Sequence, residues 1–147
     1  MISIDIINDY SSQLFYKTDI INNLFKSILI AENKKISCIS VILTDKKYLN
    51  MLKKKYFNMD HFTDVIAFNL ENSNENIDGE IYISVDDVLE NSKLFKTTFD
   101  NEFKRVFIHG ILHLFGYSDN NEKNIKIMRK LEDKYLLNCK EEILSLK

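Results

Sequence analysis

Two of the three histidines in the chain, His109 and His113, lie four residues apart in a stretch with helical spacing of apolar residues. Each residue of an α-helix turns by about 100°, so residues four apart project from one face and two imidazoles can chelate one metal ion. Gly116 can end the helix in a left-handed conformation, so that the chain turns back and presents Asp119 as a third ligand. Two nitrogens and one carboxylate oxygen leave the fourth position of a tetrahedral Zn²⁺ for water, as in catalytic zinc sites.

The residue after the first histidine limits the chemistry of this centre. Zinc peptidases of the His-Glu-x-x-His type have a glutamate there as general base, whereas this chain has Gly110. The third ligand has alternatives, because Asp119 can instead cap the last helix. In that case His61 is the remaining imidazole that can bind the metal. The pattern therefore favours a metal-dependent hydrolase that is not an ordinary peptidase.

Length and composition are typical of one soluble globular domain over residues 1–147, with 45% hydrophobic and 29% charged residues. No signal peptide and no apolar run of about 18 residues is found, so we expect a cytoplasmic protein with no membrane partner. The net charge of −2 requires that any contact with nucleic acid is made by a local patch. Cys38 and Cys139 form no CxxC pair, which argues against a thiolate zinc site, and we expect both to be buried.

Hydrophobic periodicity predicts interleaved strands and helices. Period-two alternation and β-branched residues indicate strands over residues 2–6, 37–43, 62–68 and 79–84, the last two paired antiparallel. Apolar residues at helical spacing indicate a helix over 18–32, a short one capped by Thr44 or Asp45, one that begins near Asp86, and two over 99–115 and 120–137. We therefore predict an α+β (α/β-like) fold, with a small, mostly mixed sheet of about four strands covered by helices. The zinc site lies on the long helix in the C-terminal half.

The segment His109-Gly110-x-Leu112-His113-Leu114-x-Gly116-Tyr117 resembles the zinc motif of the YbeY family of bacterial endoribonucleases. Thr63-Asp64-Val65-Ile66-Ala67-Phe68 is similar to the TDV-containing strand of that family, and Gly79-Glu80-Ile81-x-Ile83-Ser84 is similar to its GDIxIS strand. The resemblance is strongest over residues 50–119 and extends over the whole chain in length and element order.

Three positions depart from the family pattern. Asp119 stands where the family most often has a third histidine; a carboxylate oxygen is an accepted zinc ligand, so coordination is preserved while the charge of the site falls. Phe57 occupies the position of an arginine, and a lysine of the run 53–55 can supply a cation there only as a point charge. Phe62 replaces a proline.

The resemblance implies a zinc-dependent, single-strand-specific endoribonuclease with one Zn²⁺ per chain and no nucleotide cofactor. The ion would polarise a phosphate oxygen, activate a water, or both. The implied substrates are ribosomal RNA precursors, chiefly the 3′ end of small-subunit rRNA, in rRNA processing and ribosome quality control. The implied partners are the ribosome or small-subunit components.

Two further residues are candidates for catalysis. Asp64 can act as general base or hold the second nitrogen of a histidine ligand, unless it is only a turn carboxylate. Arg105, one turn before His109, can reach a phosphate at the metal or pair with Glu102 at i, i+3. The candidates for binding RNA are Lys53, Lys54, Lys55, Lys104 and Tyr117, with Phe57 and Phe62 as further rings on which bases can stack.

Two other functions are compatible with the same residues. One is a metal-dependent hydrolase of another substrate class, such as peptides, against which Gly110 argues. The other is a ribosome assembly factor with a structural metal and little nuclease activity, which Phe57 in place of the family arginine makes plausible. Metal analysis combined with assays on single-stranded RNA and casein separates the three.

Overall fold

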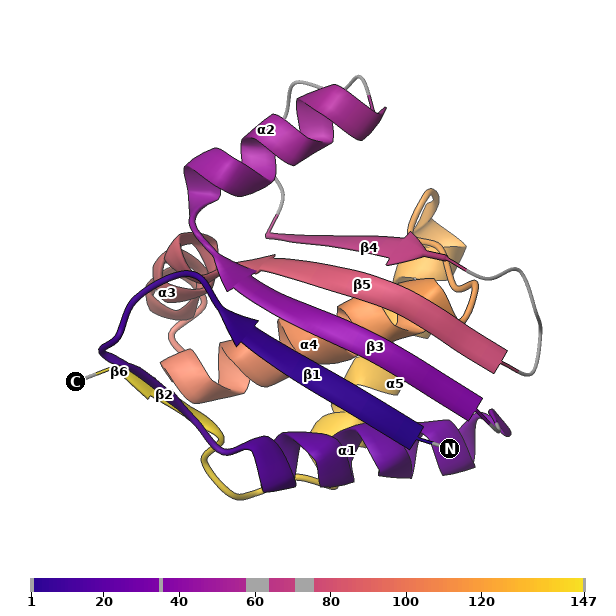
Figure 1. The fold of residues 1–147 in the computed structure, drawn as a ribbon. Helices are drawn as coiled ribbons and strands as arrows, with labels where there is room; N and C mark the ends of the chain where they lie inside the picture. Colours follow the sequence, from indigo (N-terminus) through magenta and orange to yellow (C-terminus); the bar gives the residue numbers. More distant parts are fainter. Residues whose placement is uncertain (1, 35, 58–63, 71–75, 147) are drawn as a thin grey trace.

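Residues 2–34, 36–57, 64–70 and 76–146 are described in the computed structural model of the chain. Their centre is a mixed sheet with the strand order β1-β3-β5-β4 (Figure 1). The three parallel strands are β1 (Ile2–Asn8), β3 (Ile36–Thr44) and β5 (Asn76–Ser84). The edge strand β4 (Val65–Asn69) runs antiparallel to β5, so the predicted pairing of these two strands is confirmed.

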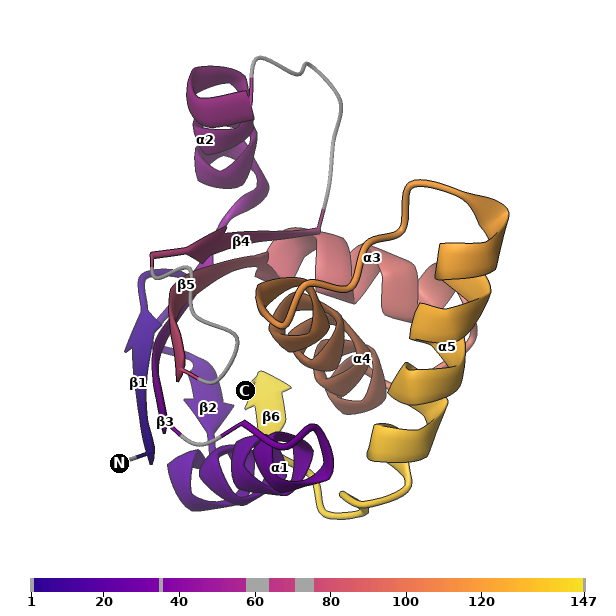
Figure 2. The same cartoon turned by 90° about the vertical axis from the view of Figure 1, so that its right-hand side faces the viewer.

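Helices lie on both faces of this sheet (Figure 2). α1 and α4 cover one face, α5 packs against α4, and α2 lies on the opposite face over β4 and β5. The helices are α1 (Thr18–Ala31), α2 (Lys46–Phe57), α3 (Val85–Leu94), α4 (Phe99–Leu114) and α5 (Glu122–Leu136). A two-stranded antiparallel ribbon joins β2 (Leu14–Tyr16) to β6 (Leu144–Leu146). None of the described helices is long and apolar enough to cross a membrane.

The main core lies between the sheet and the layer of α1 and α4. Side chains alternate between the two faces of a strand, and on this face Val41, Ile81 and Ile83 are almost fully buried. They belong to one hydrophobic cluster with Phe25 of α1 and Phe107 of α4. Burial of this apolar surface on folding is the main favourable term that holds α4, and with it both histidines, against the sheet.

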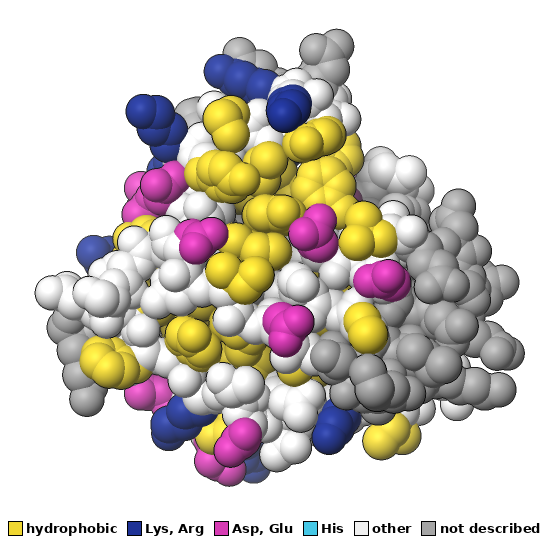
Figure 3. Space-filling view, viewed as in Figure 1, with side chains coloured by type: hydrophobic (Ala, Val, Ile, Leu, Met, Phe, Trp, Pro, Cys, Tyr) yellow, Lys and Arg dark blue, Asp and Glu magenta, His cyan; other side chains and the backbone are white. Residues whose placement is uncertain are grey.

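A smaller cluster lies on the opposite face, where Leu49 and Leu52 of α2 pack on Ile66 of β4. Hydrophobic side chains continue from this cluster onto the surface over α2 and the neighbouring strands (Figure 3). Phe57, at the end of α2, stacks on Phe68 with ring centroids 5.5 Å apart. Phe57 is therefore part of an aromatic surface on the face of the sheet away from α4.

Two glycines allow α4 and the strands to approach closely. A Cβ atom at Gly110 would lie 2.9 Å from Cγ2 of Ile81 and 3.2 Å from Cγ2 of Val65. A Cβ atom at Gly79 would lie 2.7 Å from the carbonyl oxygen of Phe68. Position 110 therefore faces the sheet, and a glutamate there would enter the core instead of acting as a base.

The predicted α+β fold is confirmed, with differences in detail. The short strands β2 and β6 were not predicted, because three residues are too few to show periodicity. The short helix expected after Thr44 or Asp45 is α2, which extends to Phe57. Cys38 is exposed, which corrects the prediction that both cysteines are buried; it lies on the open face of β3, whereas Cys139 is buried. The predictions for His61 and Phe62 concern positions outside the described residues.

Candidate metal centre

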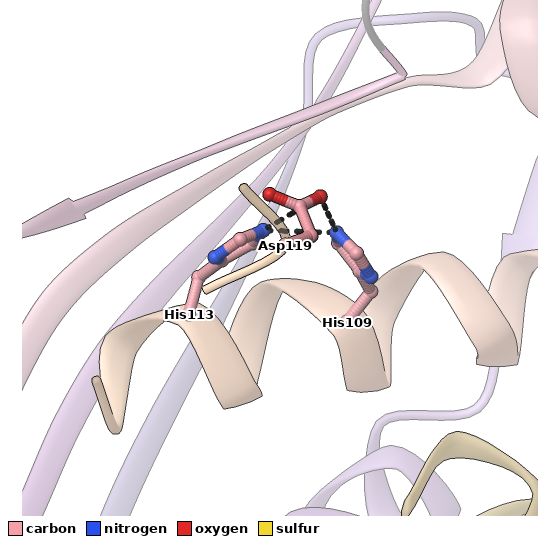
Figure 4. A group of neighbouring side chains, drawn as sticks. All are labelled: His109, His113 and Asp119. Carbon is pink, nitrogen blue, oxygen red and sulfur yellow. Dashed lines mark hydrogen bonds and ion pairs between the residues drawn. The ribbon is translucent and has the colours of Figure 1, made fainter. Parts of the chain in front are cut away.

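The two histidines are carried by α4, whose first turn is capped by Thr98. The Thr98 hydroxyl accepts a hydrogen bond from the backbone N–H of Asn101 at 3.0 Å, which satisfies one of the free donors at the helix start. His109 and His113 project from one face of the helix, as their spacing predicts, and both side chains are partly buried (Figure 4). Their Nε2 atoms lie 2.9 Å apart and so point at a common position.

The loop after α4 brings a carboxylate to the same position. Gly116 has φ of +100°, the left-handed conformation expected of it after the helix end. Beyond this turn, Oδ2 of Asp119 lies 3.4 Å from Nε2 of His109 and 3.7 Å from Nε2 of His113. Asp119 does not cap the last helix, because the N-cap of α5 is Asn121.

The spacing of these atoms can be compared with a metal site. Zinc–nitrogen bonds of about 2.0–2.1 Å in a tetrahedron separate two ligand atoms by roughly 3.3–3.4 Å. The three distances in the cluster, 2.9, 3.4 and 3.7 Å, bracket that value. Together with Asp119, His109 and His113 can therefore hold one metal ion, and imidazole with carboxylate is a donor set that suits Zn²⁺.

Each imidazole is oriented by an acceptor at its other nitrogen. Nδ1 of His109 lies 2.9 Å from Oε2 of Glu132, and Nδ1 of His113 lies 3.0 Å from the carbonyl oxygen of Tyr117. Because both partners are acceptors, we assign the proton to Nδ1 in each ring and the lone pair to Nε2. That tautomer directs both lone pairs at the metal position, and such outer contacts are a regular part of zinc sites.

The same contacts set the acid strength of the two rings in opposite directions. Burial alone would lower the pKa of His109, but the hydrogen bond and charge of Glu132 outweigh it and raise that pKa above its ordinary value. The pKa of His113 is lowered, first by burial and then by the neighbouring His109. His113 is therefore the ring that more readily stays neutral, the form in which an imidazole binds a metal.

Sequence reasoning did not identify Glu132. Glu132 lies on the buried face of α5, one helical turn after Met128 and three residues before Tyr135, and its side chain is only 7% exposed. An acidic residue at helical spacing within an apolar face is the signal that would have identified it, since a buried carboxylate needs a partner.

Asp64 lies beside the centre, in a cavity of about 680 Å³ that His109 and Asp119 also line. Burial raises the pKa of the Asp64 carboxyl, and the charge of His109 opposes that rise. Nδ2 of Asn91 donates a hydrogen bond to Oδ2 of Asp64 at 3.3 Å. Asp64 therefore lies near the cluster. The sequence had left open whether this residue is part of the centre or only a turn carboxylate.

Arg105 lines the same cavity and pairs with two carboxylates of α5. Its NH1 lies 3.1 Å from Oε1 of Glu132, and its NH2 lies 3.1 Å from Oδ1 of Asp133. Burial alone would lower the pKa of Arg105, but these two hydrogen bonds outweigh it and raise that pKa. Arg105 thus forms its ion pairs with Glu132 and Asp133, and not with Glu102, which the sequence had left as the alternative partner.

The lysines fall into different environments. Lys104 is buried, 2.8 Å from Oδ2 of Asp100, and donates to the carbonyl oxygen of Cys139, so its prediction as an RNA contact is wrong: its ammonium group ties α4 to the chain after α5. Lys53 is also buried; burial lowers its pKa, while the charges of Asp64 and Asp119 oppose that change. The remaining two of the run, Lys54 and Lys55, are exposed on α2.

Tyr117 contributes to the centre in a way that its prediction as an RNA contact did not include. Its hydroxyl donates a hydrogen bond to Oε1 of Glu32 at 2.6 Å, which raises the pKa of Tyr117 to about 12. Its ring packs against the main core. What Tyr117 offers the centre is its backbone carbonyl, which orients His113.

The fold and the site together define an α+β protein in which a helix seated on a mixed sheet and the loop after it converge two imidazoles and one carboxylate. Residues 6–140 match the family model of Endoribonuclease YbeY. The chain is 42% identical over 114 residues to the endoribonuclease YbeY of Flavobacterium psychrophilum, covering 78% of this chain and 81% of that protein. It is also 42% identical over 115 residues to the endoribonuclease YbeY of Karelsulcia muelleri, with the same coverage. A solution structure from Thermotoga maritima has a TM-score of 0.62 at 31% identity and covers 90% of this chain and 86% of that one. The chain therefore belongs to the YbeY family, as its resemblance predicted.

Proposed function

We propose that the chain is a metal-dependent, single-strand-specific endoribonuclease that hydrolyses RNA phosphodiesters during maturation of small-subunit rRNA and in ribosome quality control. The observation that carries the proposal is the convergence of Nε2 of His109, Nε2 of His113 and Oδ2 of Asp119 at the edge of a cavity. The name endoribonuclease, borne by relatives 42% identical to this chain, supports RNA as the substrate.

His109, His113 and Asp119 would hold one Zn²⁺, and the bound ion would supply a Lewis acid and lower the pKa of a water toward 7. The role of the surrounding residues is to orient both imidazoles so that each Nε2 lone pair faces the metal position. Glu132 and the Tyr117 carbonyl do this by holding the two Nδ1 protons.

Asp64 is the proposed general base. The hydrogen bond from the Asn91 amide to Oδ2 holds this carboxylate in place to take a proton from the attacking water. Burial favours the protonated form of this carboxyl, which raises its pKa and makes it a stronger base than an exposed aspartate.

Arg105 is the proposed contact for the scissile phosphate. A guanidinium carries five N–H donors, and the bonds to Glu132 and Asp133 engage NH1 and NH2. The remaining N–H donors are available to a phosphate oxygen in the cavity. The two carboxylates hold the guanidinium in a fixed orientation. Lys53, near Asp64 and Asp119, would add a charge, and Lys54 and Lys55 would meet the backbone of the RNA further from the centre.

The proposed substrate places the activity in the cytoplasm, with ribosomal RNA precursors and components of the small subunit as partners.

The test is to load the purified protein with zinc and assay one RNA sequence in single-stranded and in duplex form, with casein as a peptide substrate in a parallel assay. We expect cleavage of the single strand only, loss of activity with a chelator, and recovery when zinc returns. Casein cleavage without RNA cleavage would identify another hydrolase. Zinc binding without any cleavage, together with accumulation of unprocessed rRNA in cells that lack the protein, would favour an assembly factor.

A further inference from the structure

We propose that the cavity beside the metal centre is a nucleobase subsite, which takes the base next to the scissile phosphate and prefers adenine and cytosine over uracil. The inference rests on the proposed function, because it assigns RNA to the site. It goes further in that it names which part of a nucleotide enters the cavity and which residues select it.

The cavity runs alongside α4 and has the metal cluster at one end. It is lined by Asn101 at the far end and by His109 at the metal end; eight residues of helix separate the two, which corresponds to about 12 Å. Its volume of about 680 Å³ is within the range of small-molecule sites. A phosphate at the metal therefore leaves room in the cavity for the attached nucleoside.

The walls suit a flat apolar ring. Val106 and Met128 are buried and form the floor, while Ile125 and Phe95 stand at the rim. Phe95, directly after α3, is 61% exposed, and none of the ring contacts among the described residues engages it. An exposed aromatic ring at the mouth of a cavity is a surface on which a base can stack.

The charges in the cavity distinguish a base from a phosphate. Five carboxyl groups line it, against the guanidinium groups of two arginines and the imidazole of His109; the carboxyl groups are those of Asp64, Glu102, Asp119, Glu132 and Asp133. Asp64, Asp119 and Glu132 lie at the metal end, and Arg105 pairs with Glu132 and Asp133. Further from the metal, the remaining carboxyl group of the cavity is that of Glu102, which does not attract a phosphate. This part of the cavity accommodates a neutral ring that presents hydrogen-bond donors. Arg129, which is exposed at the rim, remains for a phosphate outside the cavity.

Glu102 is the group that would read the base. It is only 3% exposed, it lines the cavity, and none of the hydrogen bonds found among the described residues reaches its carboxyl. The ionised carboxylate accepts a hydrogen bond from an exocyclic amine, as glutamate does with the N4 amine of cytosine, and it has no proton to donate to a carbonyl oxygen. Uracil presents a carbonyl oxygen at that position, which leaves the carboxylate without a partner. Adenine and cytosine are therefore preferred over uracil.

Binding of mononucleotides to the zinc-loaded protein tests this subsite without any need for cleavage. By calorimetry at about pH 8.5, where the Glu102 carboxyl is ionised, we expect AMP and CMP to bind about fivefold or more tighter than UMP. We expect AMP to bind about tenfold tighter than ribose 5-phosphate, which has the phosphate but no base. Phe95→Ala should remove most of the difference between AMP and ribose 5-phosphate. Leu94→Ala is the matched control, because Leu94 is the neighbouring residue, is 72% exposed and does not line the cavity.

A second variant tests the reading of the base. In Glu102→Gln the amide can present oxygen to an amine or NH₂ to a carbonyl, so AMP should bind as before while UMP rises to a similar affinity. Equal binding of AMP and UMP to the wild type, or a Phe95→Ala variant that behaves like Leu94→Ala, would overturn the subsite. Base-selective binding without RNA cleavage would refute the proposed function alone, and RNA cleavage without base-selective binding would refute the subsite alone.

Discussion

Glu132 offers a sharp test of how the centre is built, because it contacts His109 without being a ligand. Its Oε2 lies 2.9 Å from Nδ1 of His109, and its side chain is only 7% exposed, so water cannot replace the bond. A hydrogen bond to a charged group contributes about 1.5–3 kcal/mol, and loss of an outer partner of a zinc ligand costs roughly 10- to 100-fold in affinity. The two estimates agree, since that range corresponds to about 1.4–2.7 kcal/mol. We therefore expect Glu132→Ala to weaken zinc binding by roughly 10- to 100-fold.

The assay is competition for zinc with a chromophoric chelator, with circular dichroism as a check on folding. Asp133→Ala is the matched control, because Asp133 makes the other bond to Arg105, at 3.1 Å, but does not contact a histidine, and it is 67% exposed. We expect this variant to bind zinc within about twofold of the wild type. Wild-type affinity in Glu132→Ala, or an equal loss in both variants, would refute the idea that Glu132 acts by orienting His109.

Three further predictions follow from single contacts. Asp119→Ala should weaken zinc binding whereas Asp119→His should keep it, as measured by the same competition; unchanged affinity in Asp119→Ala would remove Asp119 from the ligand set. Burial raises the pKa of Glu102 from 4.5 to about 7, so the contribution of this group to the stability of the metal-free protein is most favourable below pH 4.5 and falls by on the order of 3 kcal/mol as the pH rises to about 7. Glu102→Gln should lack this loss. In urea unfolding at pH 4.5 and pH 8, the free energy of unfolding of the variant minus that of the wild type should therefore increase with pH, and a difference that does not change with pH would contradict the assignment. Gly79→Ala should lower the free energy of unfolding by about 1–3 kcal/mol, because the new Cβ would lie 2.7 Å from the Phe68 carbonyl oxygen; an unfolding midpoint equal to that of the wild type would show that β4 and β5 can separate without cost.

The sequence was most informative where spacing alone determines geometry. His109 and His113 had to share a face of any helix that contains them, and Gly116 had to adopt a conformation that reverses the chain. The antiparallel pair β4 and β5 followed from two apolar runs joined by a polar segment. These features depend on residues close together in the chain, so local rules were sufficient.

Features that depend on packing between distant elements were beyond the sequence. Lys104 lies one residue before Arg105, yet it faces Asp100 and the carbonyl of Cys139, whereas Arg105 faces the cavity. The contact between Glu132 and His109 joins α5 to α4. Which residue of α4 meets Glu132 depends on how the two helices pack, and the sequence does not give that packing. The same holds for Phe95, an unremarkable residue after a helix until the fold places it at the rim of the cavity.

The central claim is that RNA cleavage depends on a metal held by α4 and the loop after it. The most direct measurement is the cleavage rate of a single-stranded RNA by wild type and His113→Ala, with the metal content of the same samples determined by elemental analysis. We predict one zinc per chain and cleavage in the wild type. In His113→Ala we predict loss of the metal and a fall in cleavage of at least about 100-fold. Cleavage at the wild-type rate by metal-free His113→Ala would contradict the account.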